Sequence, residues 1–197
     1  MLAVKEGPIK EVEDFKYLGS WIINSKKDIS VRTAIAWKAL KQLKTVWKSH
    51  LSKDFKLYVF NTLIQSILLY SCETWSLTQT LEKKLDGTRN LMVRYALNIS
   101  WKEHIPNSII FAGIVPISAL IRDRRVKFAG HCLRAKDQPV KDLVLWRGTG
   151  KSKGGNVKTY TKILGNDLAD KGILERSVRF GEYDTEEIVE LALARHF

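Results

Sequence analysis

The chain of 197 residues carries 33 Lys and Arg against 21 Asp and Glu, a formal net charge of +12, and 45% of it is hydrophobic. That length fits one medium domain or two small ones, and the apolar content is sufficient for a core. A positive surplus of this size favours a polyanionic partner, nucleic acid before a membrane surface, over a basic but inert surface. The most apolar run, residues 63–70, is shorter than the about 20 residues that span a bilayer.

Cysteine content and the N-terminal sequence indicate the compartment. Cys72 and Cys132 are the two cysteines, and no apolar segment typical of a signal peptide follows Met1. We therefore expect a reduced intracellular compartment, nucleus or cytoplasm.

Large aromatic and polar side chains alternate between Phe15 and Trp21, which is typical of a short strand. Gly19 lies in this stretch and allows a tight bend. We therefore predict a β-hairpin within residues 1–25. Because a lone hairpin is marginally stable in water, it either pairs with a segment outside the chain or packs as a lid on the helices that follow.

The remainder is predicted to be helical, so the expected fold class is mainly α. Asp28 is expected to cap a helix over residues 29–49, with an apolar residue every three to four positions and lysines mostly off that stripe. Ser52 is expected to cap a second helix over residues 53–70. Since this helix is apolar around most of its circumference, we predict that it is buried at the centre of a bundle.

The later helices follow from capping residues, prolines and periodicity. They are predicted from a start between Ser76 and Thr80, where Ser76 and Gln79 have capping-box spacing, to Asn98, from Asn107 to Gly113, from 116 to 135, from Pro139 to Trp146, from 159 to 171, and from Asp184 to the C-terminus. Gly87 is a weak point inside the first of these. The predicted domains are a hairpin (1–25), a helical bundle (26–147), a basic flexible loop (148–156), and a small, loosely attached helical segment (157–197).

Common catalytic and metal-binding patterns are not matched. The Gly-Lys-Ser sequence at 150–152 lacks the first glycine of a phosphate loop, because Leu145 stands at that position. His131 and Cys132 are adjacent, which is poor metal-ligand spacing, and we expect His131 to be a packed or hydrogen-bonded core residue. Asp167 and Asp170 share a helix face that we expect to be solvated. The prediction is no metal, no cofactor and no catalytic residue.

Three motifs occur in a fixed order. They are Phe-Lys-Tyr-Leu-Gly-Ser at 15–20, Leu-Tyr-Ser-Cys-Glu-Thr-Trp at 69–75, and Arg-Arg-Val-Lys-Phe-Ala-Gly-His-Cys-Leu-Arg at 124–134. Together, over about residues 5–171, they resemble the C-terminal part of the reverse transcriptase of non-LTR (LINE-type) retrotransposons. In that family the first motif is the primer-grip hairpin at the end of the palm, and the helices after it form the thumb, which holds the template–primer duplex.

The resemblance implies descent from an RNA-directed DNA polymerase with an endonuclease domain upstream. The family's paired-Asp motif, which binds two Mg²⁺ in the palm, does not occur in this sequence. We therefore expect a truncated reverse-transcriptase fragment that is inactive alone. Its expected partners are RNA–DNA or DNA duplex, without sequence preference, and the missing palm and fingers or an intact polymerase in trans, but no membrane.

The candidate site residues are basic side chains and the hairpin. Nucleic-acid contacts are predicted for Lys38, Lys41, Lys44, Lys48, Arg122, Arg124, Arg125, Lys127, Arg134, Lys151 and Lys153, and the resemblance implies a primer-grip-like role for Phe15, Tyr17 and Gly19. Contacts of Lys and Arg with phosphate carry no base information, so binding should be sequence-nonspecific. Two alternatives are a helical protein-interaction module with incidental charge and a non-functional pseudogene product.

Overall fold

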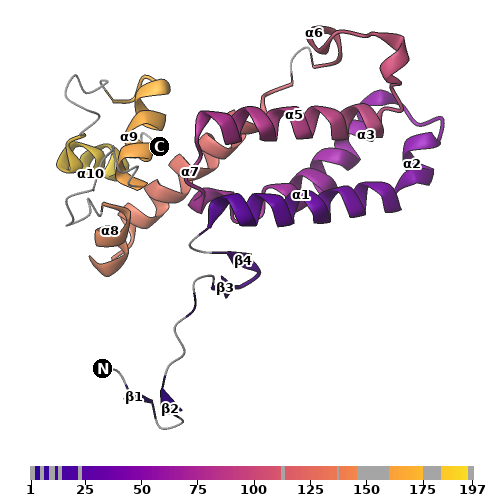
Figure 1. The fold of residues 1–197 in the computed structure, drawn as a ribbon. Coiled ribbons are helices and arrows are strands. Elements are labelled where there is room, and N and C mark those ends of the chain that lie inside the picture. The colour runs from indigo at the N-terminus through magenta and orange to yellow at the C-terminus, as the bar shows by residue number, and fades with distance from the viewer. Residues whose placement is uncertain are drawn as a thin grey trace. The chain divides into compact units, whose positions relative to one another are not determined.

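The computed structural model describes residues 12, 15–21, 24–111, 114–136, 138–145, 160–174 and 183–194, together with two short strands nearer the N-terminus. The chain divides into two compact units, Met1–Ser71 and Cys72–Phe197. Both are built mainly from helices, which confirms the predicted fold class (Figure 1). The predicted domain boundaries at residues 25, 147 and 156 stay predictions.

Short antiparallel strand pairs begin the first unit. Strand β1 (Ala3–Val4) pairs with β2 (Gly7–Pro8), and β3 (Lys16–Tyr17) pairs with β4 (Ser20–Trp21). Two residues, Leu18 and Gly19, connect β3 to β4, with φ of 47° and 88°. Positive φ at both positions is the geometry that two-residue hairpin loops require. The predicted hairpin is therefore present within residues 1–25.

The helices of the first unit are α1 (Ser25–Gln42), α2 (Lys44–Lys48), α3 (Lys53–Val59), the π-helical turn η1 (Phe60–Ile64) and α4 (Gln65–Leu68). Helix α1 packs against η1 and α4. The predicted cap at Asp28 is wrong, because the Asn24 side chain accepts a hydrogen bond from the backbone N–H of Lys27 and starts α1 earlier. The Ser52 cap is confirmed, since its hydroxyl accepts from the backbone N–H of Phe55 at 3.2 Å.

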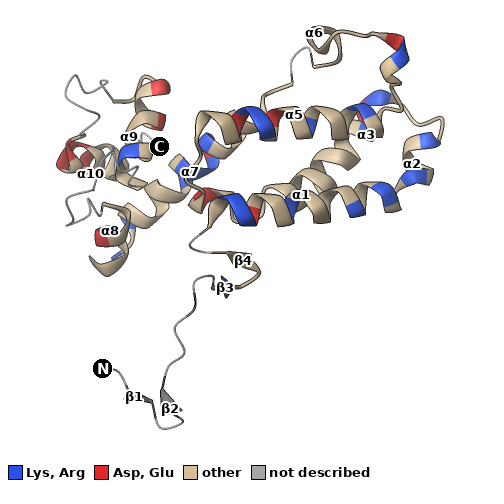
Figure 2. Cartoon of the chain, in the orientation of Figure 1, with Lys and Arg blue, Asp and Glu red and all other residues tan. Residues whose placement is uncertain are grey.

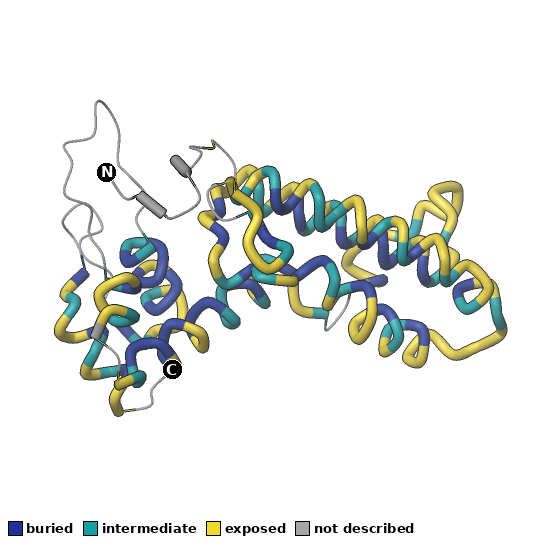
Figure 3. Tube along the Cα trace, turned by 90° about the horizontal axis from the view of Figure 1, so that it is seen from below, coloured by how far each residue is buried: buried dark blue, intermediate teal, exposed yellow. Residues whose placement is uncertain are grey.

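The prediction that residues 53–70 are buried on all sides is wrong. Phe60, Ile64 and Leu68 form the buried stripe, with one residue every four positions. Phe55 and Tyr58 are exposed in the same helical run. Figure 3 shows how buried and exposed residues alternate along the helices of the chain. Apolar composition alone could not distinguish the buried side from the exposed one.

The second unit contains two 3-10 turns and six helices among its described residues. They are η2 (Cys72–Thr74), α5 (Gln79–Ala96), η3 (Trp101–Glu103), α6 (Asn107–Ile110), α7 (Ile117–Arg134), α8 (Gln138–Val144), α9 (Tyr160–Asp170) and α10 (Thr185–Leu193). The predicted Ser76–Gln79 capping box is replaced by Thr78, whose hydroxyl accepts from the backbone N–H of Leu81 at 3.3 Å. Asp184 caps α10 as its sequence suggests.

The C-terminal helices share a hydrophobic core with α7. Val126, Ala129 and Leu133 of α7 belong to the same buried cluster as Leu164 of α9 and Ile188 of α10. The predicted loose attachment of residues 157–197 is therefore wrong for α9 and α10. The loop predicted at 148–156 lies outside the described residues.

Candidate nucleic-acid interface

Four lysines form a row along α1 and α2. Lys38, Lys41, Lys44 and Lys48 are all exposed. Figure 2 shows Lys and Arg residues along these two helices. Within the part of the chain that the structure describes, no hydrogen bond or ion pair engages any of the four ammonium groups. We call them the lysine row.

The orientation of the lysine row follows from the apolar side of the same helices. Ala36, Leu40 and Trp47 are almost completely buried, and the Trp47 indole N–H donates to the carbonyl of Leu40 at 2.7 Å. Lys56 is buried as well, and its ammonium donates to the carbonyl of Trp47 at 2.8 Å. Because these contacts fix the inner side of α1 and α2, the lysine row is directed outward.

The field around the lysine row is positive. Residues 24–71 contain nine Lys and Arg but two acidic residues, Asp28 and Asp54. Asp28 is buried and lies 3.8 Å from the Nε of Arg32, so Asp54 is the exposed carboxylate of this segment. An anionic ligand approaching α1 and α2 therefore meets little repulsion.

The basic residues of α7 are arranged differently, and the prediction for Arg125 is wrong. Its side chain is 1% exposed, and its guanidinium donates to the Asp167 carboxylate at 2.6 Å and to the carbonyl of Trp75 at 3.1 Å. A guanidinium that is buried and paired in this way is closed to an external phosphate. The Asp167 prediction is wrong too, because this carboxylate is buried instead of solvated.

Burial dominates the titration of Asp167. Desolvation raises the pKa of its carboxyl to about 6, although the nearby Arg125 and Arg122 guanidinium groups act in the opposite direction. A pKa above the usual range means that the folded chain binds this proton more tightly than the unfolded chain does. The stabilising contribution of this proton is therefore complete below pH 4 and is lost as the pH rises through about 6.

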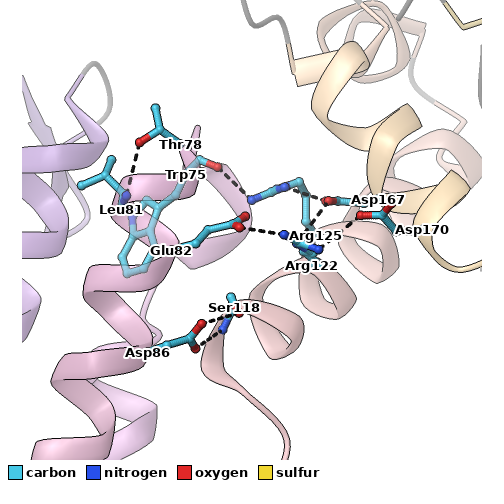
Figure 4. A network of polar contacts seen from close by, with 10 residues as sticks. All are labelled: Trp75, Thr78, Leu81, Glu82, Asp86, Ser118, Arg122, Arg125, Asp167 and Asp170. Atoms are coloured by element: carbon cyan, nitrogen blue, oxygen red, sulfur yellow. Dashed lines mark hydrogen bonds and ion pairs between the residues drawn. The ribbon is translucent and has the colours of Figure 1, made fainter.

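Arg122 is also used inside the second unit. Its guanidinium donates to Glu82 at 2.7 Å and to Asp170 at 3.2 Å, and its Nε lies 3.9 Å from Asp167. Figure 4 shows Arg122 and Arg125 reaching from α7 to acidic side chains of α5 and α9. The predicted phosphate contact of Arg122 is replaced by these three carboxylates, whose hydrogen bonding and charge raise its pKa.

The other residues of α7 that were predicted to contact nucleic acid differ in how accessible they are to a ligand. Arg134 donates to the carbonyl of Ala192 in α10 at 3.1 Å. The Arg124 side chain hydrogen-bonds the buried Cys72 thiol, whose pKa rises to about 12 by desolvation. Lys127 pairs with Asp123 at 2.8 Å, yet its side chain is 72% exposed, so this weak surface pair leaves the ammonium accessible. Lys151 and Lys153 lie outside the described residues.

The primer-grip-like residues lie on the β3–β4 hairpin. Phe15 and Tyr17 are exposed, and a β-carbon at Gly19 would meet the Arg32 guanidinium at 3.5 Å. The Tyr70 hydroxyl donates to the carbonyl of Leu18 at 2.8 Å, and Arg32 donates to the carbonyl of Gly19. The structure thus holds this hairpin on helices of its own unit, as the lid alternative expected.

A second set of contacts anchors the strand after the turn. The buried Asp28 carboxylate accepts from the Ser20 hydroxyl at 3.0 Å and from the backbone N–H of Trp21 at 3.2 Å. The Arg32 guanidinium also lies over the Tyr70 ring, 4.1 Å from its centroid. We call Asp28, Arg32 and Tyr70 the turn clamp. Sequence reasoning missed the role of all three, because no spacing signal links them to the hairpin.

Metal-binding and membrane-spanning features are not found in the described ranges. No group of three or more His, Cys, Asp and Glu side chains there is placed to hold a metal ion. None of the helices described combines the length and the hydropathy that crossing a bilayer needs. His131 is exposed, so its predicted packing in the core is wrong.

Comparison with known proteins points to mobile elements. No protein-family model and no solved structure matches the chain. A transposon-derived protein of Caenorhabditis elegans is 23% identical over 138 residues, which cover 66% of this chain and 50% of that protein. The chain thus spans about half the length of this relative. The chain is therefore similar, at low identity, to a transposon-derived protein.

Proposed function

We propose that the chain is a thumb-like fragment of a retrotransposon reverse transcriptase that binds the sugar–phosphate backbone of template–primer nucleic acid. The observation that carries this proposal is the lysine row, four exposed ammonium groups on α1 and α2 that no described residue engages. The ordered motifs that resemble the reverse transcriptase support the polymerase origin, and the similarity to a transposon-derived protein supports an origin in a transposon.

The spacing of the lysine row suits a nucleic-acid strand. Lys38 and Lys41 are separated by roughly 4.5 Å along the axis of α1, and Lys44 and Lys48 by roughly 6 Å along that of α2, at 1.5 Å per residue. One strand of a duplex presents a phosphate about every 3.4 Å along its axis, so each pair of lysines can reach phosphates one or two positions apart. Flexible lysine side chains on successive turns can follow such a strand without recognising its bases.

The proposed interface is narrower than the sequence suggested. For the duplex it retains the lysine row of the first unit. The contact of Lys127, which lies in the second unit, and the primer-grip-like role of Phe15, Tyr17 and Gly19 stay separate predictions. Arg122 and Arg125 leave the interface, because their guanidinium groups hold helices of the second unit together. Binding should therefore depend on α1 and α2 more than on the densest cluster of basic residues in the sequence.

The proposal predicts a salt-dependent affinity that two substitutions reduce. We expect the Lys38→Gln/Lys41→Gln variant to bind an RNA–DNA duplex more weakly and to lower the slope of log K against log salt by about two, because two counterion-releasing contacts are lost. Fluorescence anisotropy with a labelled duplex at several salt concentrations measures both quantities.

A matched variant controls for the loss of net charge. Lys83 and Lys84 are exposed on α5, outside the proposed interface, so Lys83→Gln/Lys84→Gln should leave the affinity and slope close to those of the unsubstituted chain. An affinity that does not change between low and moderate salt, or equal losses in the two variants, would contradict the proposal.

One observation favours protein interaction as a second candidate function. Phe55, Tyr58 and Leu63 are 48%, 65% and 47% exposed on the same helical run, which is an unusual density of large apolar side chains on a surface. This alternative predicts no duplex binding and a protein partner whose affinity is insensitive to salt.

A further inference from the structure

Two aromatic rings are displayed together on the β3–β4 hairpin. Phe15 is 51% exposed and Tyr17 is 57% exposed, although burial of such rings normally stabilises a fold. Their centroids lie 6.5 Å apart with 23° between the ring planes, so the two rings are stacked in a nearly parallel arrangement. The hairpin therefore presents flat apolar surfaces to the solvent.

The turn next to these rings is held in a fixed conformation. Leu18 has a φ of 47°, which is unfavourable for a residue with a branched side chain, and it is retained where surrounding contacts enforce it. The turn clamp supplies those contacts as two hydrogen bonds. The Tyr70 hydroxyl donates to the carbonyl of Leu18, and the Arg32 guanidinium donates to the carbonyl of Gly19. A hairpin fixed before a ligand arrives loses little conformational entropy on binding.

The charges described around the hairpin are mainly positive. Lys16 is exposed between the two aromatic residues, and the Lys27 ammonium lies 3.7 Å from the centroid of the Trp21 ring. The Asp28 carboxylate is buried beside Arg32. The acidic residues that precede Phe15 in the sequence lie outside the described residues. Flat aromatic surfaces interleaved with cations suit a ligand that has both π-faces and negative charge.

We propose that Phe15 and Tyr17 form a stacking platform for unpaired bases of a single-stranded segment next to a bound duplex. This rests on the proposed function for the duplex part, but it assigns a different chemistry to the hairpin. The bases inside a duplex already stack on one another, so free base faces occur where a strand is unpaired. The lysine row binds phosphates, whereas the platform binds bases without reading their identity.

The test separates base stacking from phosphate binding by the choice of probe. It compares three labelled probes: a blunt RNA–DNA duplex, the same duplex with an oligothymidine tail, and that duplex with an abasic tail of equal length. The abasic tail keeps the phosphates and removes the bases. We expect the full chain to bind the oligothymidine tail more tightly than the abasic tail by at least about fivefold, since stacking on an aromatic side chain contributes about this much per base.

Three variants test whether the platform causes the preference for the oligothymidine tail. Phe15→Ala/Tyr17→Ala should remove the preference for the oligothymidine tail and keep binding of the blunt duplex. Phe55→Ala/Tyr58→Ala is the matched control, because these rings are also exposed neighbours, with centroids 6.3 Å apart, and it should keep the preference. Tyr17→Trp should keep it too, because the larger ring still stacks.

The failure of each proposal has its own signature. Equal affinity for the two tails, or an equal loss of preference in the α3 control variant, overturns the stacking platform even if the lysine variant still weakens duplex binding. If the blunt duplex does not bind, the proposed duplex function fails. Binding of a free oligothymidine strand that Phe15→Ala/Tyr17→Ala abolishes would then still support stacking, and no such binding would overturn it.

Discussion

Arginine and lysine residues on one helix have opposite roles in this protein. Arg125 and Lys127 are two positions apart on α7, and both belong to the same basic motif in the sequence. The side chain of Arg125 is 1% exposed and that of Lys127 is 72% exposed, because residues two apart lie on nearly opposite sides of a helix. Net charge predicted a binding surface, but only packing decides which charges are on it.

Loss of the Arg125 guanidinium should be costly and dependent on pH. We expect Arg125→Leu to reduce the free energy of unfolding by about 3–5 kcal/mol near neutral pH, because Asp167 is left buried without its partner. Removing that positive charge raises the pKa of Asp167 further above its value of about 6. Protonation of Asp167 at pH 5 should therefore make the loss of unfolding free energy in the variant smaller. The loss should grow as the pH rises towards 8.

Lys127→Leu is the control on the same helix for this measurement. Its exposed pair with Asp123 should contribute less than about 1 kcal/mol, with no comparable change between pH 5 and 8. Urea denaturation followed by circular dichroism at both pH values gives all the free energies. A deficit of Arg125→Leu that is equal to that of the control, or that shrinks with rising pH, would show that the ion pair does not stabilise the unit as described.

At the scale of elements, two helical glycines have opposite surroundings. Gly87 lies in α5 with no atom within 4 Å of the position that a β-carbon would take. Gly165 lies in α9, where a β-carbon would overlap the Tyr183 ring. The Tyr183 hydroxyl also donates to the Asn166 side chain at 2.8 Å, which keeps the ring against α9.

The two glycines should therefore respond with opposite sign to the same substitution. Gly165→Ala is expected to destabilise the fold by about 1–3 kcal/mol through overpacking against Tyr183. Gly87→Ala is expected to stabilise it by up to about 1 kcal/mol, because alanine is the better helix former at an open position. The melting temperatures of the two variants, measured by thermal unfolding, test this prediction. A shift of the melting temperature in the same direction for both variants would contradict the packing of α9.

Sequence patterns predicted most helices and some of their caps, but they misplaced the start of others. Periodicity located the helices that became α1, α5, α7 and α9, since one apolar residue every three to four positions reflects a single buried side. The start of α1 was placed too late, because Asp28 is a good capping residue by type but serves the hairpin instead. Local chemistry could not show that a contact to another element competes for that side chain.

For the whole molecule, we predict that the chain alone does not extend a primer. Nucleotide transfer by a polymerase needs converging carboxylates that hold two metal ions, and the sequence lacks the paired-Asp motif. We expect no extension of a primer on an RNA template with dNTPs and Mg²⁺, measured by gel electrophoresis. Adding an active reverse transcriptase to the same reaction checks the substrates, and any template-dependent extension by the purified chain would contradict this prediction.

The candidate site was predictable in part. Exposed lysines off the apolar stripe of a helix follow from periodicity, so the lysine row could be found from the sequence. Arg122 and Arg125 are excluded from the proposed interface because they pair with Glu82 and Asp167. Glu82 precedes Arg122 by 40 residues, and Asp167 follows Arg125 by 42 residues. Contacts at such separations are set by how helices pack in the second unit, and no local pattern encodes them.

The bond between Tyr70 and Leu18 has a consequence for the order of folding. It joins residues 52 positions apart, so the segment between them must close as a loop before the bond can form. Helix formation is local and fast, whereas contacts between distant residues form later. We therefore expect the hairpin to be the last part of its unit to become ordered during refolding, after α4 has docked on α1.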